Sequence, residues 1–191
     1  MDDPEQDSGN RPKGSRGSLT DAGSGSFQAP ILREVLRPGL RLVFCGSAPG
    51  KRSALLSEYY AGPGNRFWPT LAEIGLTPKQ LSPSEFELLL TYGIGLTDLV
   101  VHEAGNDADI TFSDAARERL EATILAYAPA YVCFNGKRSA KEYLQERSVH
   151  YGLQSRRIGT TQLFVAPSTS GAARRSWDLS PWQELASLVR R

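Results

Sequence analysis

Four short apolar runs constrain the fold more than any other feature of this chain. Each run is continuous rather than alternating, which is typical of strands that are buried on both faces of a parallel sheet. Each is followed by small or turn-forming residues, so the runs predict strands that end at loops. The four runs are Leu42–Cys45, Ile94–Thr97, Tyr131–Phe134 and Leu163–Val165.

Helix signals separate these runs. Residues 82–85 read Ser-Pro-Ser-Glu, a capping box with proline at the first helical position, and residues 180–183 read Ser-Pro-Trp-Gln, a second such box. Between them, residues 114–127 place an apolar stripe on one helical face. Phe67 and Trp68, ahead of the first box, begin a further core helix. Strands that alternate with helices predict the α/β class, with a mostly parallel sheet covered on both faces.

The predicted topology also indicates where a ligand would bind. In open α/β sheets, ligands bind beyond the carboxyl ends of the strands. We therefore expect the loops that follow Cys45, Thr97, Phe134 and Val165 to converge on one crevice.

Composition sets the limits of the folded domain and excludes several classes of protein. Residues 1–30 hold five glycines and five serines with few apolar residues, which predicts a disordered tail before a single domain at 31–191. Two cysteines and two histidines argue against a disulfide scaffold and a zinc site, and we expect no metal or cofactor. No apolar run is long enough to span a membrane, so the expected compartment is the cytoplasm.

The net charge of +1 hides a basic region in the second half of the chain. Residues 137–158 carry six Lys and Arg residues but only two acidic ones, and Arg174 and Arg175 follow. Such a surface can attract a polyanion, although a solvated face explains the same charges.

The first loop, residues 46–53, reads Gly-Ser-Ala-Pro-Gly-Lys-Arg-Ser. It is not a phosphate-binding P-loop, because three residues rather than four separate its glycines and Arg52 occupies the Ser/Thr position. Tyr60 lies shortly after it, ahead of a Gly-Pro-Gly turn. An aromatic face beside open backbone donors suits a flat heterocycle, so Tyr60 is a candidate for stacking on a base.

The last loop, residues 166–175, contains small hydroxyl residues, Gly171 and two arginines. These features suit a loop that presses against a phosphate backbone, and they also suit an ordinary polar turn before a helix.

Five segments of the chain carry a resemblance to a known family: Gly46–Gly50, Tyr60–Trp68, Gly95–Val100, Phe134–Lys137 and Pro167–Gly171. In their order and spacing they resemble the mismatch-specific uracil/thymine DNA glycosylase family of the uracil-DNA glycosylase superfamily. The resemblance implies a three-layer α/β/α sandwich that flips a base out of DNA and hydrolyses its N-glycosidic bond without metal or cofactor.

Two positions depart from the family's pattern. The family usually has Asn at the position of Ala48, where it positions the attacking water, and a methyl group cannot do so. Relatives also fill the gap left by the flipped base with a Leu or Arg wedge, where this chain has Ala172, which is too small. We therefore expect Arg174 to act as the wedge, with Arg175 or Lys137 on phosphate.

A carboxylate could replace the missing Asn, because it would stabilise an oxocarbenium-like sugar and orient water. Asp98 is the first candidate, since it follows the second strand inside a family motif, although it could instead be a turn acceptor. Glu58, beside Tyr60, is the second candidate.

These observations predict a monofunctional glycosylase of DNA base-excision repair that removes uracil from G·U mismatches. Two alternatives remain open: excision of hypoxanthine or xanthine, and an inactive DNA-binding module that has lost its catalytic Asn at Ala48. We expect a monomer that acts on damaged double-stranded DNA in the cytoplasm, at the nucleoid in a bacterium. The expected base pocket comprises Gly46, Ser47, Ala48, Tyr60, Asn65 and Ser168, and the expected DNA contacts are Lys137, Ser170, Gly171, Ala172, Arg174 and Arg175.

Overall fold

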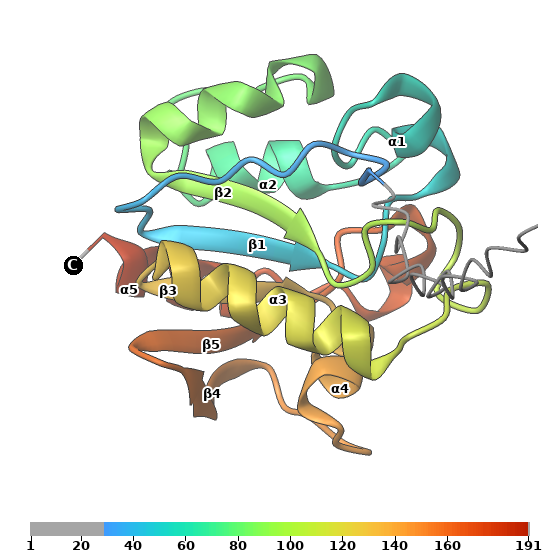
Figure 1. The fold of residues 1–191 in the computed structure, drawn as a ribbon. Coiled ribbons are helices and arrows are strands. Elements are labelled where there is room, and N and C mark those ends of the chain that lie inside the picture. Colours follow the sequence, from blue (N-terminus) through green and yellow to red (C-terminus); the bar gives the residue numbers. More distant parts are fainter. Residues whose placement is uncertain (1–28, 191) are drawn as a thin grey trace, which may run out of the picture.

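A five-stranded sheet forms the centre of the computed structural model, which describes residues 29–190 (Figure 1). The strand order is β2-β1-β3-β5-β4, in which β4 alone runs antiparallel to its neighbour. The strands are β1 Leu42–Gly46, β2 Ile94–Asp98, β3 Tyr131–Asn135, β4 Gly152–Ile158 and β5 Thr161–Ala166.

Helices cover both faces of this sheet, so the predicted three-layer α/β/α sandwich is confirmed. Helices α3 and α4 pack on one face, and α2, η1 and α5 pack on the other (Figure 1). The helical elements are α1 Lys51–Leu56, α2 Phe67–Glu73, η1 Pro83–Tyr92, α3 Asp114–Tyr127, α4 Lys137–Leu144, η2 Gly171–Ser176 and α5 Ser180–Val189; η1 and η2 are 3₁₀ helices.

The two cores follow from the alternation of side chains along each strand. In β1, Leu42 and Phe44 face the core under α2 and α5, whereas Val43 and Cys45 face the core under α3 and α4. Both sets are buried, which explains why the sequence of β1 is a continuous apolar run. Cys133 faces the side opposite to Cys45, so the sheet separates the two thiols.

The structure differs from the sequence-based prediction in one strand and one helix cap. The strand β4 was not predicted, because its exposed centre carries Arg156 and Arg157 rather than an apolar run. The second capping box is wrong: Leu179 is the N-cap of α5, and the Ser180 N–H donates to Asp178 Oδ1 at 2.9 Å. The expected tail lies outside the described residues, apart from Ala29 and Pro30.

The chain before β1 runs along the outer edge of β2 (Figure 1). Val35 and Leu96 exchange two backbone hydrogen bonds of 2.9 and 3.0 Å, and the Ile31 N–H donates to the Val101 carbonyl at 2.8 Å. This pairing fixes the position of Glu34 beside the end of β2. Within the described residues, no helix is long and apolar enough to cross a membrane.

Candidate active site

A cleft of about 700 Å³ lies at the carboxyl ends of the four parallel strands. The loops that follow β1, β2, β3 and β5 all contribute to its lining, so the predicted convergence of these loops is confirmed. Most of the expected base-pocket and DNA-binding residues lie here. The lining includes Gly46, Ser47, Ala48, Tyr60, Asn65, Asp98, Lys137, Ser168, Ser170, Gly171 and Ala172.

Asp98 is the last residue of β2, directly opposite Gly46 in the parallel register with β1. Only 3% of its surface is exposed, although it lines the cleft. Burial raises the pKa of Asp98 to about 7; the negative charge of Glu34 also raises this pKa, and Arg119 partly offsets the rise. The carboxyl group therefore gains and loses its proton near neutral pH, which suits a general base.

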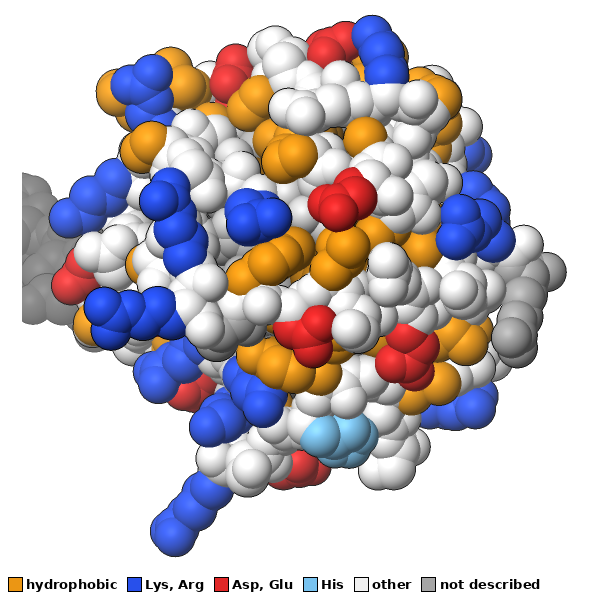
Figure 2. Space-filling view, turned by 180° about the vertical axis from the view of Figure 1, so that it is seen from behind, with side chains coloured by type: hydrophobic (Ala, Val, Ile, Leu, Met, Phe, Trp, Pro, Cys, Tyr) orange, Lys and Arg blue, Asp and Glu red, His pale blue; other side chains and the backbone are white. Residues whose placement is uncertain are grey.

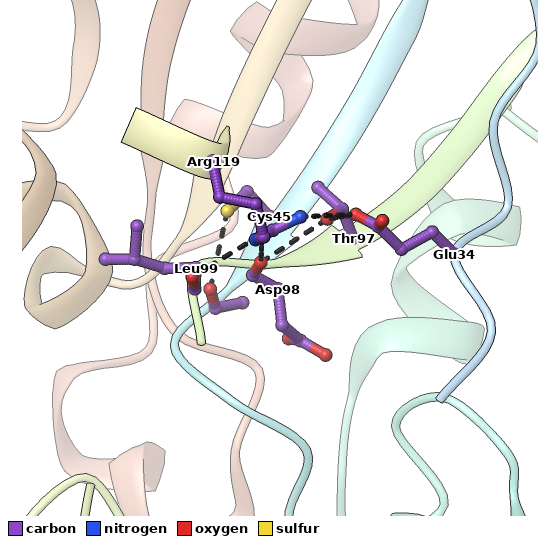
Figure 3. A network of polar contacts seen from close by, with 7 residues as sticks. Glu34, Cys45, Thr97, Asp98, Leu99 and Arg119 are labelled. Carbon is purple, nitrogen blue, oxygen red and sulfur yellow. Dashed lines mark hydrogen bonds and ion pairs between the residues drawn. The ribbon is translucent and has the colours of Figure 1, made fainter. Parts of the chain in front are cut away.

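The carboxylate of Asp98 points away from Glu34 and Arg119, although its backbone carbonyl faces them (Figure 3). On the cleft side, the carboxylate of Asp98 packs against the backbone of Gly46, which has no side chain. The first loop is held to the second by backbone bonds of 2.9 Å, from the Leu99 N–H to Gly46 and from the Val100 N–H to Ser47.

Tyr60 lines the cleft and packs against the core. Its ring stacks on Phe67 with the centroids 4.0 Å apart and the planes inclined by 27°. The backbone is left-handed, with φ of 55°, which is uncommon for a residue that is not glycine. Since Phe67 covers one ring face, only the other face could stack on a base.

The hydroxyl of Tyr60 is buried near the side chain of Asn135, but no hydrogen bond of good geometry reaches it among the described residues. Burial, and to a smaller degree the charge of Asp98, raises the pKa of Tyr60 well above its ordinary value. The phenol is therefore neutral at physiological pH and brings no charge to the site.

Two asparagines that line the cleft also hold its loops in place through hydrogen bonds. Asn65 Oδ1 accepts a 3.0 Å hydrogen bond from the Phe67 N–H at the start of α2. Asn135, which the sequence analysis did not single out, binds Thr169 twice: its Oδ1 accepts from the Thr169 N–H at 3.0 Å, and its Nδ2 donates to the hydroxyl at 2.9 Å. This pair joins the end of β3 to the last loop.

Glu58, the second candidate for the catalytic carboxylate, is half-buried but does not line the cleft. The Glu58 N–H donates to the carbonyl of Ser53, behind the first loop. The structure thus brings Asp98 and not Glu58 together with the other expected pocket residues.

Basic side chains surround the cleft on two elements. Lys51 and Arg52 of α1 are exposed at one rim, and Lys137 and Arg138 of α4 line another part. Lys137 Nζ lies 4.2 Å from the centroid of the Tyr151 ring, and Arg138 pairs with Glu142 at 3.1 Å. In the view from behind, more Lys and Arg side chains gather on the left, the side toward which β1 and β2 point (Figure 2).

The sequence analysis did not predict Lys51 and Arg52 as residues of the cleft. It placed Gly46, Ser47 and Ala48 of the first loop in the base pocket and weighed the basic pair only against the P-loop pattern, although this pair carried the signal for the rim of the cleft.

The last loop, residues 166–175, packs against the Gly-Pro-Gly turn at residues 62–64. A Cβ on Gly171 would lie only 2.9 Å from the carbonyl oxygen of Pro63, and a Cβ on Gly64 would overlap Nη2 of Arg174. The guanidinium of Arg174, the expected wedge, therefore lies against Gly64. Exposed Arg175 follows it in η2.

Within residues 29–190, no group of three or more His, Cys, Asp or Glu side chains could hold a metal ion. What the site does offer is one buried carboxyl group with a pKa near neutrality, an aromatic ring beside it and basic side chains around the rim. That combination suits acid–base chemistry on a substrate that carries an anionic backbone.

Residues 34–188 match the family model described as the Uracil DNA glycosylase superfamily. The fold is similar to the solution NMR structure of a candidate uracil DNA glycosylase from Methanosarcina acetivorans, with a TM-score of 0.60 and 21% sequence identity. This similarity covers 84% of the present chain and 97% of the archaeal chain.

Proposed function

The chain belongs to the uracil DNA glycosylase superfamily, and from this premise we propose that it is a monofunctional, mismatch-specific DNA glycosylase that removes uracil from G·U pairs. A glycosylase cannot reach the glycosidic bond inside the duplex, so the target nucleotide turns out of the helix into a pocket. The cleft at the ends of the four parallel strands is that pocket in this proposal.

The observation that carries the proposal is the position of Asp98. Cleavage of the bond places positive charge on the deoxyribose, and a carboxylate close to the sugar stabilises that charge and orients the attacking water. Asp98 supplies the only carboxylate on the strand ends that form the floor of the cleft, among the residues that the structure describes. Ala48 lies in the same cleft, so Asp98 takes over the role of the Asn that relatives have at that position.

The other groups of the cleft serve binding. The free face of Tyr60 stacks on the flipped base, and backbone groups of Gly46 and Ser47 read its edge. In this proposal Lys51, Arg52 and Lys137, which line the cleft, contact phosphates on either side of the flipped nucleotide.

A panel of labelled oligonucleotides tests this function. Uracil is placed opposite guanine, opposite adenine and in a single strand, and product strands are scored after alkaline cleavage of the abasic site. We expect the fastest single-turnover excision from the G·U duplex and almost none with Asp98→Asn, which retains DNA binding. Strand breakage without alkali, or covalent trapping by borohydride, would contradict a monofunctional mechanism, since among the described residues Lys51 and Lys137 bring amines to the cleft.

The volume of the cleft supports a second candidate. About 700 Å³, bordered by Gly46, Ser47 and Ala48, leaves room for a purine as well as a pyrimidine. The same panel therefore includes hypoxanthine and xanthine, and preference for either over uracil would favour this second activity. Binding of every duplex without excision of any base would instead show that the chain is an inactive DNA-binding module.

A further inference from the structure

An ion pair lies behind Asp98, on the side away from the cleft. Arg119 Nη1 of α3 lies 2.9 Å from Oε1 of Glu34, which belongs to the segment that pairs with the edge of β2. Both side chains are only 25% exposed, so the pair is shielded from water more than an ordinary surface ion pair.

This pair holds three consecutive residues at the end of β2 (Figure 3). Arg119 Nη2 donates to the backbone carbonyl of Asp98 and, at 3.5 Å, to that of Leu99. The hydroxyl of Thr97 donates to Oε1 of Glu34. The strand β2 lies at the edge of the sheet, so within residues 29–190 no further strand of the sheet holds its outer side. These side-chain hydrogen bonds hold the end of β2 instead.

The same two side chains place opposite charges near the Asp98 carboxylate without touching it. The negative charge of Glu34 opposes ionisation of Asp98, and the positive charge of Arg119 favours it. Within residues 29–190, the other titratable groups that interact with Asp98 are Cys45 on β1 and Tyr59 and Tyr60 after α1. Burial raises the pKa of all three, so they carry no charge near neutral pH.

We propose that Glu34 and Arg119 are positioning residues for the reaction, which hold the end of β2 and place two opposing charges behind the catalytic carboxylate. The proposal rests on the proposed function for the role of Asp98 in excision. Neither side chain lines the cleft, so neither contacts the substrate.

Substitutions that remove one charge at a time should shift the acid side of the pH–rate profile in opposite directions. In Glu34→Gln, an amide oxygen can still accept from Thr97, and the profile should shift to lower pH because Asp98 ionises more easily. In Arg119→Gln the profile should shift to higher pH, because Glu34 then acts unopposed. Each shift should be on the order of half to one pH unit for a partly shielded charge.

Arg119→Lys separates charge from geometry. It retains the positive charge, so the profile should stay close to that of the wild type. An ammonium group cannot bind Glu34 and two carbonyls as a planar guanidinium does, so the plateau rate should fall severalfold while affinity for DNA is unchanged. Arg117→Gln is the matched control, since Arg117 lies on the same helix but pairs with Asp114, away from Asp98.

The experiment measures single-turnover excision of uracil from a G·U duplex between pH 5 and 9 for the wild type and these four variants. In parallel, carboxyl ¹³C NMR of aspartate-labelled protein follows the titration of Asp98 directly, with the Asp98→Asn protein as the assignment control. Opposite shifts for Glu34→Gln and Arg119→Gln, with none for Arg117→Gln, are the expected result.

Profiles and titrations that coincide with those of the wild type, or that shift in the same direction in both variants, would overturn the proposal. A wild-type protein that excises no base would overturn the proposed function alone, because the NMR titration still measures the effect of each charge on Asp98.

Discussion

Asp98 occupies the space that a side chain on Gly46 would need. The two residues are partners in the register between β1 and β2, and a Cβ built on Gly46 would overlap Oδ1 of Asp98. The catalytic carboxylate of the proposed mechanism is therefore placed by the absence of a side chain on the neighbouring strand.

Gly46→Ala should slow excision strongly by displacing that carboxylate. We expect a loss of at least about a hundredfold in the single-turnover rate, since small misplacements of reacting groups have effects of this size. Gly50→Ala is the matched control in the same loop, because nothing lies within 4 Å of a Cβ on Gly50 and it should retain wild-type activity. Equal activity of the two variants would show that the position of Asp98 is not critical.

Asp98→Asn should raise the stability of the protein at high pH while it removes activity. The folded protein holds the proton of Asp98 up to a pH of about 7, whereas the unfolded chain loses it near 3.8. Stability therefore falls as pH rises between these values, by up to roughly 4 kcal/mol. The difference in Tm between variant and wild type should grow from pH 5 to pH 8 and then level off; a difference independent of pH would refute this account.

Tyr60→Phe should leave excision and stability close to those of the wild type, because the hydroxyl that it removes is buried without a hydrogen bond of good geometry among the described residues. Tyr60→Ala should slow excision roughly tenfold to a hundredfold through loss of stacking worth about 1–3 kcal/mol. Single-turnover rates at saturating enzyme measure this effect, and thermal unfolding controls for the lost contact with Phe67. Wild-type excision by Tyr60→Ala would reduce Tyr60 to a packing residue.

Ala48→Asn should fold normally, because Ala48 is half-buried at the edge of an open cleft. A second group able to hold water near Asp98 should raise the rate of uracil excision or widen the range of bases removed. The oligonucleotide panel measures both outcomes. Failure of the variant to fold would mean that this loop is not equivalent to the loop of relatives.

Arg174→Ala should lose excision on duplex DNA but little on single strands. A wedge matters only where the gap in a base stack must be filled, and Arg174 can leave Gly64 to enter it. Arg175→Ala is the comparison: loss of a phosphate contact should weaken binding to both substrates and reduce the salt dependence by about one unit of slope. If Arg174→Ala lost excision equally on duplex and single-stranded DNA, Arg174 would be a phosphate contact like Arg175 and not a wedge.

Much of the fold was predictable because a strand that is buried on both faces has a continuous apolar sequence, as β1 and β3 do. The edge strand β4 escaped because its charged centre faces solvent. Asp98 could be proposed as a site residue because its position at the end of a strand can be predicted from the neighbouring sequence. Glu34 could not be proposed, because it meets Thr97 across 63 residues of sequence and lies in a segment without a helical or strand pattern.

The segment around Val35 has a consequence for any shortened form of this protein. It satisfies the backbone of Leu96 on the open side of β2 and carries Glu34. A chain that began after Val35 would retain all five strands and every residue of the cleft except Leu32. It would nevertheless present an unpaired strand edge, which invites self-association, and it would leave Arg119 without its counter-charge.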